Sequence, residues 1–481
     1  MATRRKNGRA RIESDLLGTK RIPASAYYGV QTLRAMENFD ISGVPISHYP
    51  DLIRGLAIIK LAAARANHQV GQLSRRVLKG IESACSDILD GKLHDQFQVD
   101  LFQGGAGTST NMAANEVIAN RALEHMGKRK GEYKYCDPHD HVNLSQSTND
   151  AYPSALHIAM VLGNQRLTEE LRELIRAFRI KGREFGRVVK MGRTQLQDAV
   201  PMTLGQEFEA FARTLEEEVA ALSAVENVLC ETNMGGTAIG TGLNAPKGYS
   251  AACAKHLSRI MRRPIRLAHN LIEATQDTQA FVLYSAVLKA VCIKLSKVCN
   301  DLRLLSSGPR AGLAEIQLPA MQPGSSIMPG KVNPVIPEVV NQVCYKIIGN
   351  DLAVTLAAEA GQLQLNVMEP IIAQCIFEGQ TLLTRASWTL REHCVRGIKA
   401  NADICRGYVE RSIGLVTALN PIIGYEHSTE LAAEALKSGR GIIELVREKR
   451  ILTEKQIREV LDPSSMTGQS AGKRGRKKAR R

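Results

Sequence analysis

The chain has 481 residues, of which 44% are hydrophobic and only 4% aromatic. This length suggests more than one domain, and a core made mainly of Leu, Val, Ile and Ala suits packed helices better than an aromatic-rich sandwich. The net charge of +15 is concentrated at the two ends of the chain, within residues 4–11 and 473–481, so we do not expect a general nucleic-acid-binding surface, although the tail could contact a polyanion weakly.

Apolar residues at helical spacing predict long helices through the middle of the chain. Two such seams are Leu167, Leu171, Leu174 and Phe178, and then Phe208, Phe211, Leu215, Val219, Leu222, Val225 and Leu229. The most regular helix is expected from Gln276 to Leu305, where apolar residues alternate steps of four and three as in a heptad seam. A fourth should run from Ile336 toward Met368. Long apolar seams predict a helical bundle and self-association.

Strand signals are sparse, and neither βαβ alternation nor an internal repeat is present. Glycine-rich breaks fall at residues 104–107, 235–242 and 322–334. We therefore expect an N-terminal domain at residues 1–142 and a central helical bundle at 143–400. A C-terminal helical domain should follow at 401–466. Residues 467–481 are predicted to form a basic disordered tail.

The cysteines and the hydropathy pattern indicate in which cellular compartment the protein is located. Ten cysteines are scattered without a CxxC pair, which is typical of reduced, buried thiols. No stretch approaches the ~20 apolar residues of a membrane span, and the basic first residues lack an apolar signal region. The sequence therefore predicts a cytoplasmic protein that does not span a membrane.

Four polar segments are rich in hydroxyl and amide side chains and poor in titratable bases: 104–111, 145–150, 192–198 and 324–334. Such groups, with one lysine, suit a small dianion such as a dicarboxylate. Any one of them alone could simply be a helix cap. No predicted strand precedes the first segment, as a dinucleotide loop requires, and the last one misses the Walker A spacing. His139 and His141 lack the spacing of common zinc sites, and no Gly-x-Ser-x-Gly elbow is present.

The segment Gly324–Pro334 resembles the signature loop of the fumarase/aspartase superfamily. Further similar segments are residues 15–18, 27–30, 235–244, 304–313 and 361–366. The continuation at 335–343 resembles the aspartate ammonia-lyases, because fumarases usually diverge after the Asn-Pro. The resemblance implies an all-α, three-domain fold with a long central helical bundle, and a homotetramer whose active sites are shared between subunits. It also implies reversible deamination of L-aspartate to fumarate and ammonia, by anti-elimination through an aci-carboxylate, without cofactor or metal.

The same resemblance assigns roles to particular residues. Ser325 matches the general base of the family, and Ser326, Lys331 and Asn333 match groups that hold the substrate. Residues matching the pocket for the carboxylate beside the departing proton are Thr108, Ser147 and Thr148. Asn149 matches a residue near the amino group, and Thr194 one near the other carboxylate.

Some positions leave alternatives open. Many superfamily members have His where this chain has Gln195, which weakens a fumarase interpretation, whereas Gly330 also occurs in fumarases. Residues 137–140 only partly resemble a second dicarboxylate site described for fumarases, and that site is not transferred. The alternatives are a fumarate hydratase, another succinyl-type lyase of the superfamily, or a non-enzymatic polyanion-binding protein that uses the basic tail.

Overall fold

The computed structural model describes residues 9–324, 326–328, 330–460 and 462. Ser325 and the basic tail, for which predictions were made, lie outside these residues. Contacts divide the chain into two compact units, each built from three stretches. The first unit comprises Met1–Thr168, Ala220–Ala290 and Tyr345–Leu383, and the second comprises Glu169–Val219, Val291–Cys344 and Thr384–Arg481. The division into four consecutive regions stays a prediction.

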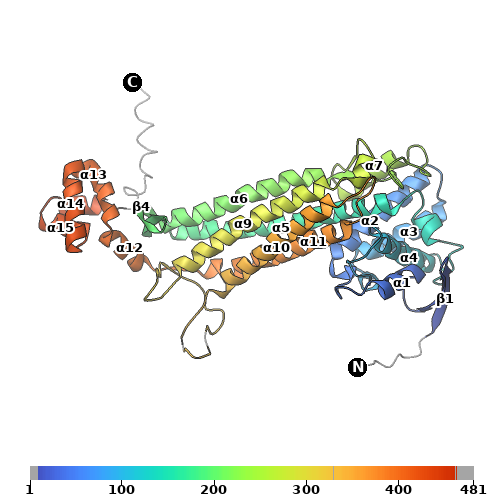
Figure 1. Ribbon diagram of the computed structural model, residues 1–481, viewed down its shortest axis with the longest axis horizontal. Coiled ribbons are helices and arrows are strands. Elements are labelled where there is room, and N and C mark those ends of the chain that lie inside the picture. The colour runs from blue at the N-terminus through green and yellow to red at the C-terminus, as the bar shows by residue number, and fades with distance from the viewer. Residues whose placement is uncertain (1–8, 325, 329, 461, 463–481) are drawn as a thin grey trace, which may run out of the picture. The chain divides into compact units, whose positions relative to one another are not determined.

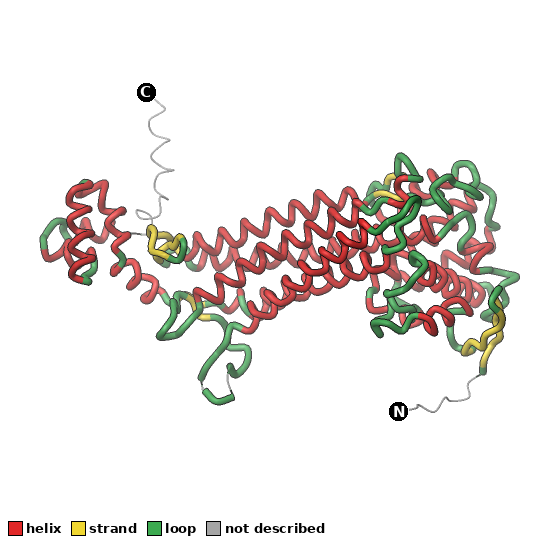
Figure 2. The backbone as a smooth tube through the Cα atoms, viewed as in Figure 1, coloured by secondary structure: helices red, strands yellow, loops and turns green. Residues whose placement is uncertain are grey.

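Five long helices contribute residues to both units, and the expectation of a mostly helical fold is confirmed (Figure 2). They are α5 (Thr148–Glu184), α6 (Leu204–Leu229), α9 (Gln279–Leu305), α10 (Val335–Glu359) and α11 (Glu369–His393). The residues that form the predicted seam of α9 are all buried, namely Tyr284, Leu288, Val291, Leu295, Val298, Leu302 and Leu305. None of the helices within the described ranges is long and apolar enough to cross a membrane.

Two of the predicted helix limits are wrong. Helix α9 begins at Gln279, because the short helix α8 (Glu273–Gln276) is separate from it. Helix α10 ends at Glu359 and does not approach Met368. The side chain of Asn366 folds back onto the end of α10 and donates to the carbonyl oxygens of residues 357 and 358 at 3.0 and 3.2 Å. This amide satisfies carbonyls that a continuing helix would have used.

The first unit also contains the N-terminal elements and the short elements between α6 and α9. Its strands and shorter helices are β1 (Ala10–Asp15), β2 (Gly18–Pro23), α1 (Val30–Asn38), α2 (Pro50–Gln69), α3 (Arg75–Leu89), α4 (Thr108–His125), β5 (Glu231–Thr232), α7 (Tyr249–Met261) and β6 (Arg266–Leu267). Strands β1 and β2 form an antiparallel hairpin, and α2 packs against both α3 and α7 (Figure 1). Helix α2 is buried along most of its length, so it supplies the core of this unit.

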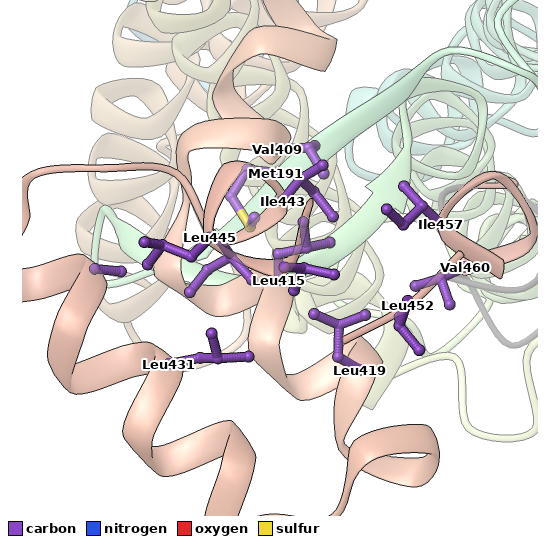
Figure 3. Packing of buried hydrophobic residues seen from close by; sticks show 13 residues of the cluster. Met191, Val409, Leu415, Leu419, Leu431, Ile443, Leu445, Leu452, Ile457 and Val460 are labelled. Atoms are coloured by element: carbon purple, nitrogen blue, oxygen red, sulfur yellow. The ribbon is translucent and has the colours of Figure 1, made fainter. Parts of the chain in front are cut away.

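The second unit contains a β-hairpin and the C-terminal helices. These elements are β3 (Val189–Thr194), β4 (Gln197–Thr203), β7 (Ile316–Gln317), β8 (Lys399–Ala400), α12 (Ala402–Arg411), α13 (Val416–Ile423), α14 (Tyr425–Ser438), α15 (Ile442–Glu448) and α16 (Glu454–Val460). Met191 of β3 enters the core formed by these helices, beside Val409 and Ile443 (Figure 3). The hairpin is therefore anchored to the C-terminal helices by apolar packing.

Candidate active site

The first unit joins two of the four polar segments at the beginnings of two helices. Helix α4 begins at Thr108, after Gly107 in a left-handed conformation with φ of 85°, and α5 begins at Thr148. The Asn111 side chain donates to the Thr148 hydroxyl at 3.1 Å, which links the first turns of the two helices. Helix N-termini present unpaired backbone N–H groups. Thr108, Ser147, Thr148 and Asn149 thus lie in a region suited to anions.

A buried lysine underlies this region. Lys60 of α2 donates from Nζ to amide oxygens of Asn111, Asn143 and Gln146 at 2.6, 2.9 and 2.9 Å. Burial lowers the pKa of Lys60 to about 7, whereas three accepting oxygens favour the ammonium form, which has three N–H donors. Sequence analysis missed this residue. The sequence feature that could have indicated it is a single lysine within the apolar stretch 58–64.

Asp150 fixes the glycine-rich stretch 235–242 against the start of α5. Its carboxylate accepts from the backbone N–H groups of Ser147, Gly235 and Thr237 at 2.9, 3.0 and 3.0 Å. Burial is the main cause that raises the pKa of Asp150, to about 6. The carboxylate therefore holds together two segments that the sequence could only identify separately.

The orientation of Asn149 follows from the same arrangement. Its side-chain nitrogen donates to the carbonyl oxygen of Ala238 at 2.7 Å, and its own carbonyl accepts from Asn233 at 3.0 Å. The side-chain oxygen thus remains as the group that can accept a hydrogen bond from a ligand. An acceptor suits an ammonium group, which agrees with the predicted place of Asn149 near the amino group.

Thr194 belongs to the second unit and is the last residue of β3. The two-residue turn that follows contains Gln195 and Leu196, with φ of 54° and 62°. Both residues are exposed, as is Thr194. Hairpin turns with two positive φ values usually contain Asn or Gly, and the Thr-Gln-Leu-Gln sequence explains why this hairpin was not predicted. The chain thus places a polar side chain at the exposed end of a narrow hairpin.

The signature loop also lies in the second unit. Its ends are joined by a bond from the backbone N–H of Gly324 to the Lys331 carbonyl at 2.8 Å, and by one from the Asn333 side chain to the Gly324 carbonyl at 2.7 Å. A Cβ at Gly324 would lie 2.4 Å from that Lys331 oxygen, so this closure requires glycine. Ser326 and Lys331 are exposed, and an open cavity of about 470 Å³ borders the loop. Ser325 lies outside the described residues.

A metal site was not predicted at His139 and His141, and the rings of both histidines have polar neighbours. His139 Nε2 lies 2.8 Å from the side-chain nitrogen of Gln31, while His141 Nδ1 accepts from the backbone N–H of Asp137. Across the described ranges, no three His, Cys, Asp or Glu side chains gather as metal ligands.

Comparisons with known proteins agree over nearly the whole chain. Residues 18–349 match the family model described as Lyase, and residues 415–468 match Fumarase C C-terminus. The chain is 60% identical over 458 residues to the aspartate ammonia-lyase of Pseudomonas aeruginosa, covering 95% of this chain and 97% of that protein. It is 57% identical over 464 residues to the aspartate ammonia-lyase of Helicobacter pylori, covering 96% and 99%.

Solved structures show the same relationship. The fumarate lyase:delta crystallin from Brucella melitensis bound to cobalt has a TM-score of 0.91 and 55% identity, over 95% of this chain and 99% of that one. The class II fumarase from Schistosoma mansoni has a TM-score of 0.87 and 35% identity, over 95% and 99%.

Proposed function

The chain belongs to the lyase family that includes aspartate ammonia-lyases and fumarases, and from this premise we propose how its residues carry out the reaction. It is a carbon–nitrogen lyase that reversibly removes ammonia from L-aspartate to give fumarate. A fumarate hydratase is not favoured, since several relatives with 53–61% identity over 95% of this chain are aspartate ammonia-lyases.

The chemical difficulty is the removal of a proton from Cβ of aspartate. The resulting negative charge must spread into the adjacent carboxylate, so the enzyme must bind this aci-carboxylate dianion better than the ground state. We assign this task to Thr108, Ser147 and Thr148. In its ammonium form, Lys60 adds positive charge behind them through the amide of Asn111, whose nitrogen contacts the Thr148 hydroxyl. This lysine-centred network is the observation that carries the proposal.

Ser325 is proposed as the base that takes the Cβ proton. A serine oxyanion needs nearby positive charge and N–H donors, and Lys331 of the same loop can supply charge. The electron pair of the C–H bond first moves into the adjacent carboxylate and gives the aci-carboxylate. That pair then returns to form the C=C bond as the C–N bond breaks on the opposite face, and the electron pair of the C–N bond leaves with ammonia. In this proposal, the side-chain oxygen of Asn149 accepts a hydrogen bond from the amino group. Thr194 binds the other carboxylate, and Ser326, Lys331 and Asn333 also hold the substrate. No added cofactor or metal is part of this proposal.

The base assignment is tested by Ser325→Ala. Fumarate formation from L-aspartate is followed by ultraviolet absorbance, and we expect kcat to fall by about 10³-fold, because general base catalysis by Ser325 is lost. Ser307→Ala is a matched control, since the hydroxyl of that serine donates to the Leu304 carbonyl and accepts from the backbone N–H of Leu313, both close to it in the sequence. Near-normal turnover by Ser325→Ala would refute the base role. Product from fumarate with water but without ammonium would instead indicate a hydratase.

We also propose that the enzyme is a homotetramer with active sites shared between subunits. Helix α10 presents Tyr345, Leu352 and Leu356 at 57, 61 and 61% exposure in the first unit. These residues recur at heptad-like spacing with exposed Gly349, so they form an apolar seam that the chain itself leaves open. A second copy of this helix would cover such a seam.

Ten unpaired, buried cysteines support the proposal of a cytoplasmic enzyme.

A further inference from the structure

We propose that Glu315 is a positioning residue for this reaction, which fixes Thr194 through Arg193 and at the same time fixes the chain that leads into the signature loop. The inference rests on the proposed role of Thr194 in binding a substrate carboxylate. Glu315 touches no substrate-binding residue directly, so it would act through its neighbours. All residues involved belong to the second unit.

Glu315 is the centre of a buried cluster of charges. Its side chain is completely buried, and its Oε1 accepts from Arg193 Nη1 at 2.7 Å. Its Oε2 lies 2.9 Å from Lys190 Nζ, and the same nitrogen donates to Glu207 at 2.6 Å. Two carboxylates thus balance two cations. Buried charges are tolerated only when they are paired in this way.

Arg193 transmits this anchoring to the hairpin. It directly precedes Thr194 in β3, and its guanidinium also lies 5.4 Å from the ring centre of Tyr408. The register of β3 and β4 is irregular between Met191 and Arg193. The turn after Thr194 holds Gln195 and Leu196 at positive φ, which is unfavourable for side chains of their size. Such a turn persists when its surroundings determine it, and the Arg193–Glu315 pair supplies that constraint at the base of the turn.

The backbone of Glu315 makes the second connection. Its N–H donates to the Leu305 carbonyl at 2.9 Å, and its carbonyl accepts from the N–H of Asn401 at 2.9 Å. The next two residues form β7, which pairs with β8 and precedes the signature loop. Tyr408, which faces Arg193, also donates to the Leu313 carbonyl at 3.1 Å. Glu315 therefore links the Thr194 hairpin, through its carboxylate, to the segment from which the signature loop departs, through its backbone.

The cluster offers a substitution that affects one link selectively. In Glu315→Gln, both cations lose the Glu315 carboxylate, but Lys190 retains Glu207 whereas Arg193 is left with a neutral amide. We expect kcat/KM to fall by about 10²-fold, since a displacement of about 1 Å in a substrate-positioning group has an effect of that order. The matched control is Glu207→Gln, which changes a carboxylate of the same cluster without contacting Arg193. It should alter kcat/KM by less than about threefold.

A double-mutant cycle with Thr194→Ala separates positioning from general stability. If Glu315 acts through Thr194, Glu315→Gln should lower kcat/KM by less than about threefold in the Thr194→Ala background. An equal loss in both backgrounds, with thermal unfolding unchanged, would overturn the inference. Should Glu315→Gln not fold, Arg193→Gln tests the same link, because Lys190 still neutralises Glu315, and the same non-additivity is expected. Full activity of Thr194→Ala would instead contradict the proposed role of Thr194 itself.

Discussion

Lys60 shows how one side chain combines stability with function. Its ammonium group organises three amide side chains below the site, yet it is fully buried. Burial lowers the pKa of Lys60 to about 7, whereas the unfolded chain keeps the ordinary value near 10.5. Between these values the unfolded chain binds one more proton at this position than the folded chain. The contribution of Lys60 to folding therefore becomes more favourable as the pH rises through this window.

Because the contribution of Lys60 to folding becomes more favourable as the pH rises, the pH dependence of stability can be predicted. We compare the wild-type chain with Lys60→Met, which keeps the length of the side chain but cannot titrate. From about pH 7 to about pH 9, the free energy of unfolding of the wild type should rise relative to the variant by up to about 2 kcal/mol. Urea denaturation at one fixed protein concentration measures it. A constant difference would mean that the three amide oxygens keep Lys60 protonated throughout that range.

Residues of this kind also mark the limit of sequence interpretation. The hydroxyl and amide segments were visible in the sequence because each is a compact polar run, and the first unit does bring Asn111 to Thr148. Lys60 and Glu315 were not selected, because each is an isolated charge whose partners lie far away in the sequence. Only the fold shows that Lys60 meets Asn143 and that Glu315 meets Arg193.

At the scale of elements, periodic patterns were predicted well and turns poorly. The heptad seam of α9 is buried as expected, because burial of one helix face leaves a repeating signal. The end of α10 was misplaced, since the side-chain bonds from Asn366 leave no such signal. The β3–β4 hairpin lacked an Asn-Gly turn, so nothing in its sequence indicated the positive φ values of Gln195 and Leu196.

The α9 seam predicts a large effect on stability. Leu295 is completely buried in the second unit, so Leu295→Ala removes apolar contacts and leaves a cavity. We expect the free energy of unfolding to fall by about 2–5 kcal/mol. Asn300→Ala on the same helix is a control, because Asn300 is exposed and its substitution should change this free energy by less than about 0.5 kcal/mol. Equal urea midpoints for the two variants would show that the seam does not stabilise the fold.

At the scale of the whole molecule, the proposed site residues are divided between the two units. Thr148 lies in the first unit, and residue 325 is numbered within the second. The proposed homotetramer would cover the exposed seam of Tyr345, Leu352 and Leu356 with a second copy of the chain. If each site takes its Thr148 and its Ser325 from different copies, two variants that are each inactive can complement one another.

Complementation gives a direct test of shared sites. Thr148→Ala and Ser325→Ala chains are unfolded together in equal amounts, refolded and assayed for fumarate formation. Random assembly should restore about a quarter of wild-type activity, because each contributing position is intact in half of the chains. Each variant refolded alone is the control for residual activity, and mixing the two without unfolding tests whether exchange of subunits is needed. Activity no higher than the average of the two separate variants would mean that each site is completed within one chain, and the shared-site arrangement would be rejected.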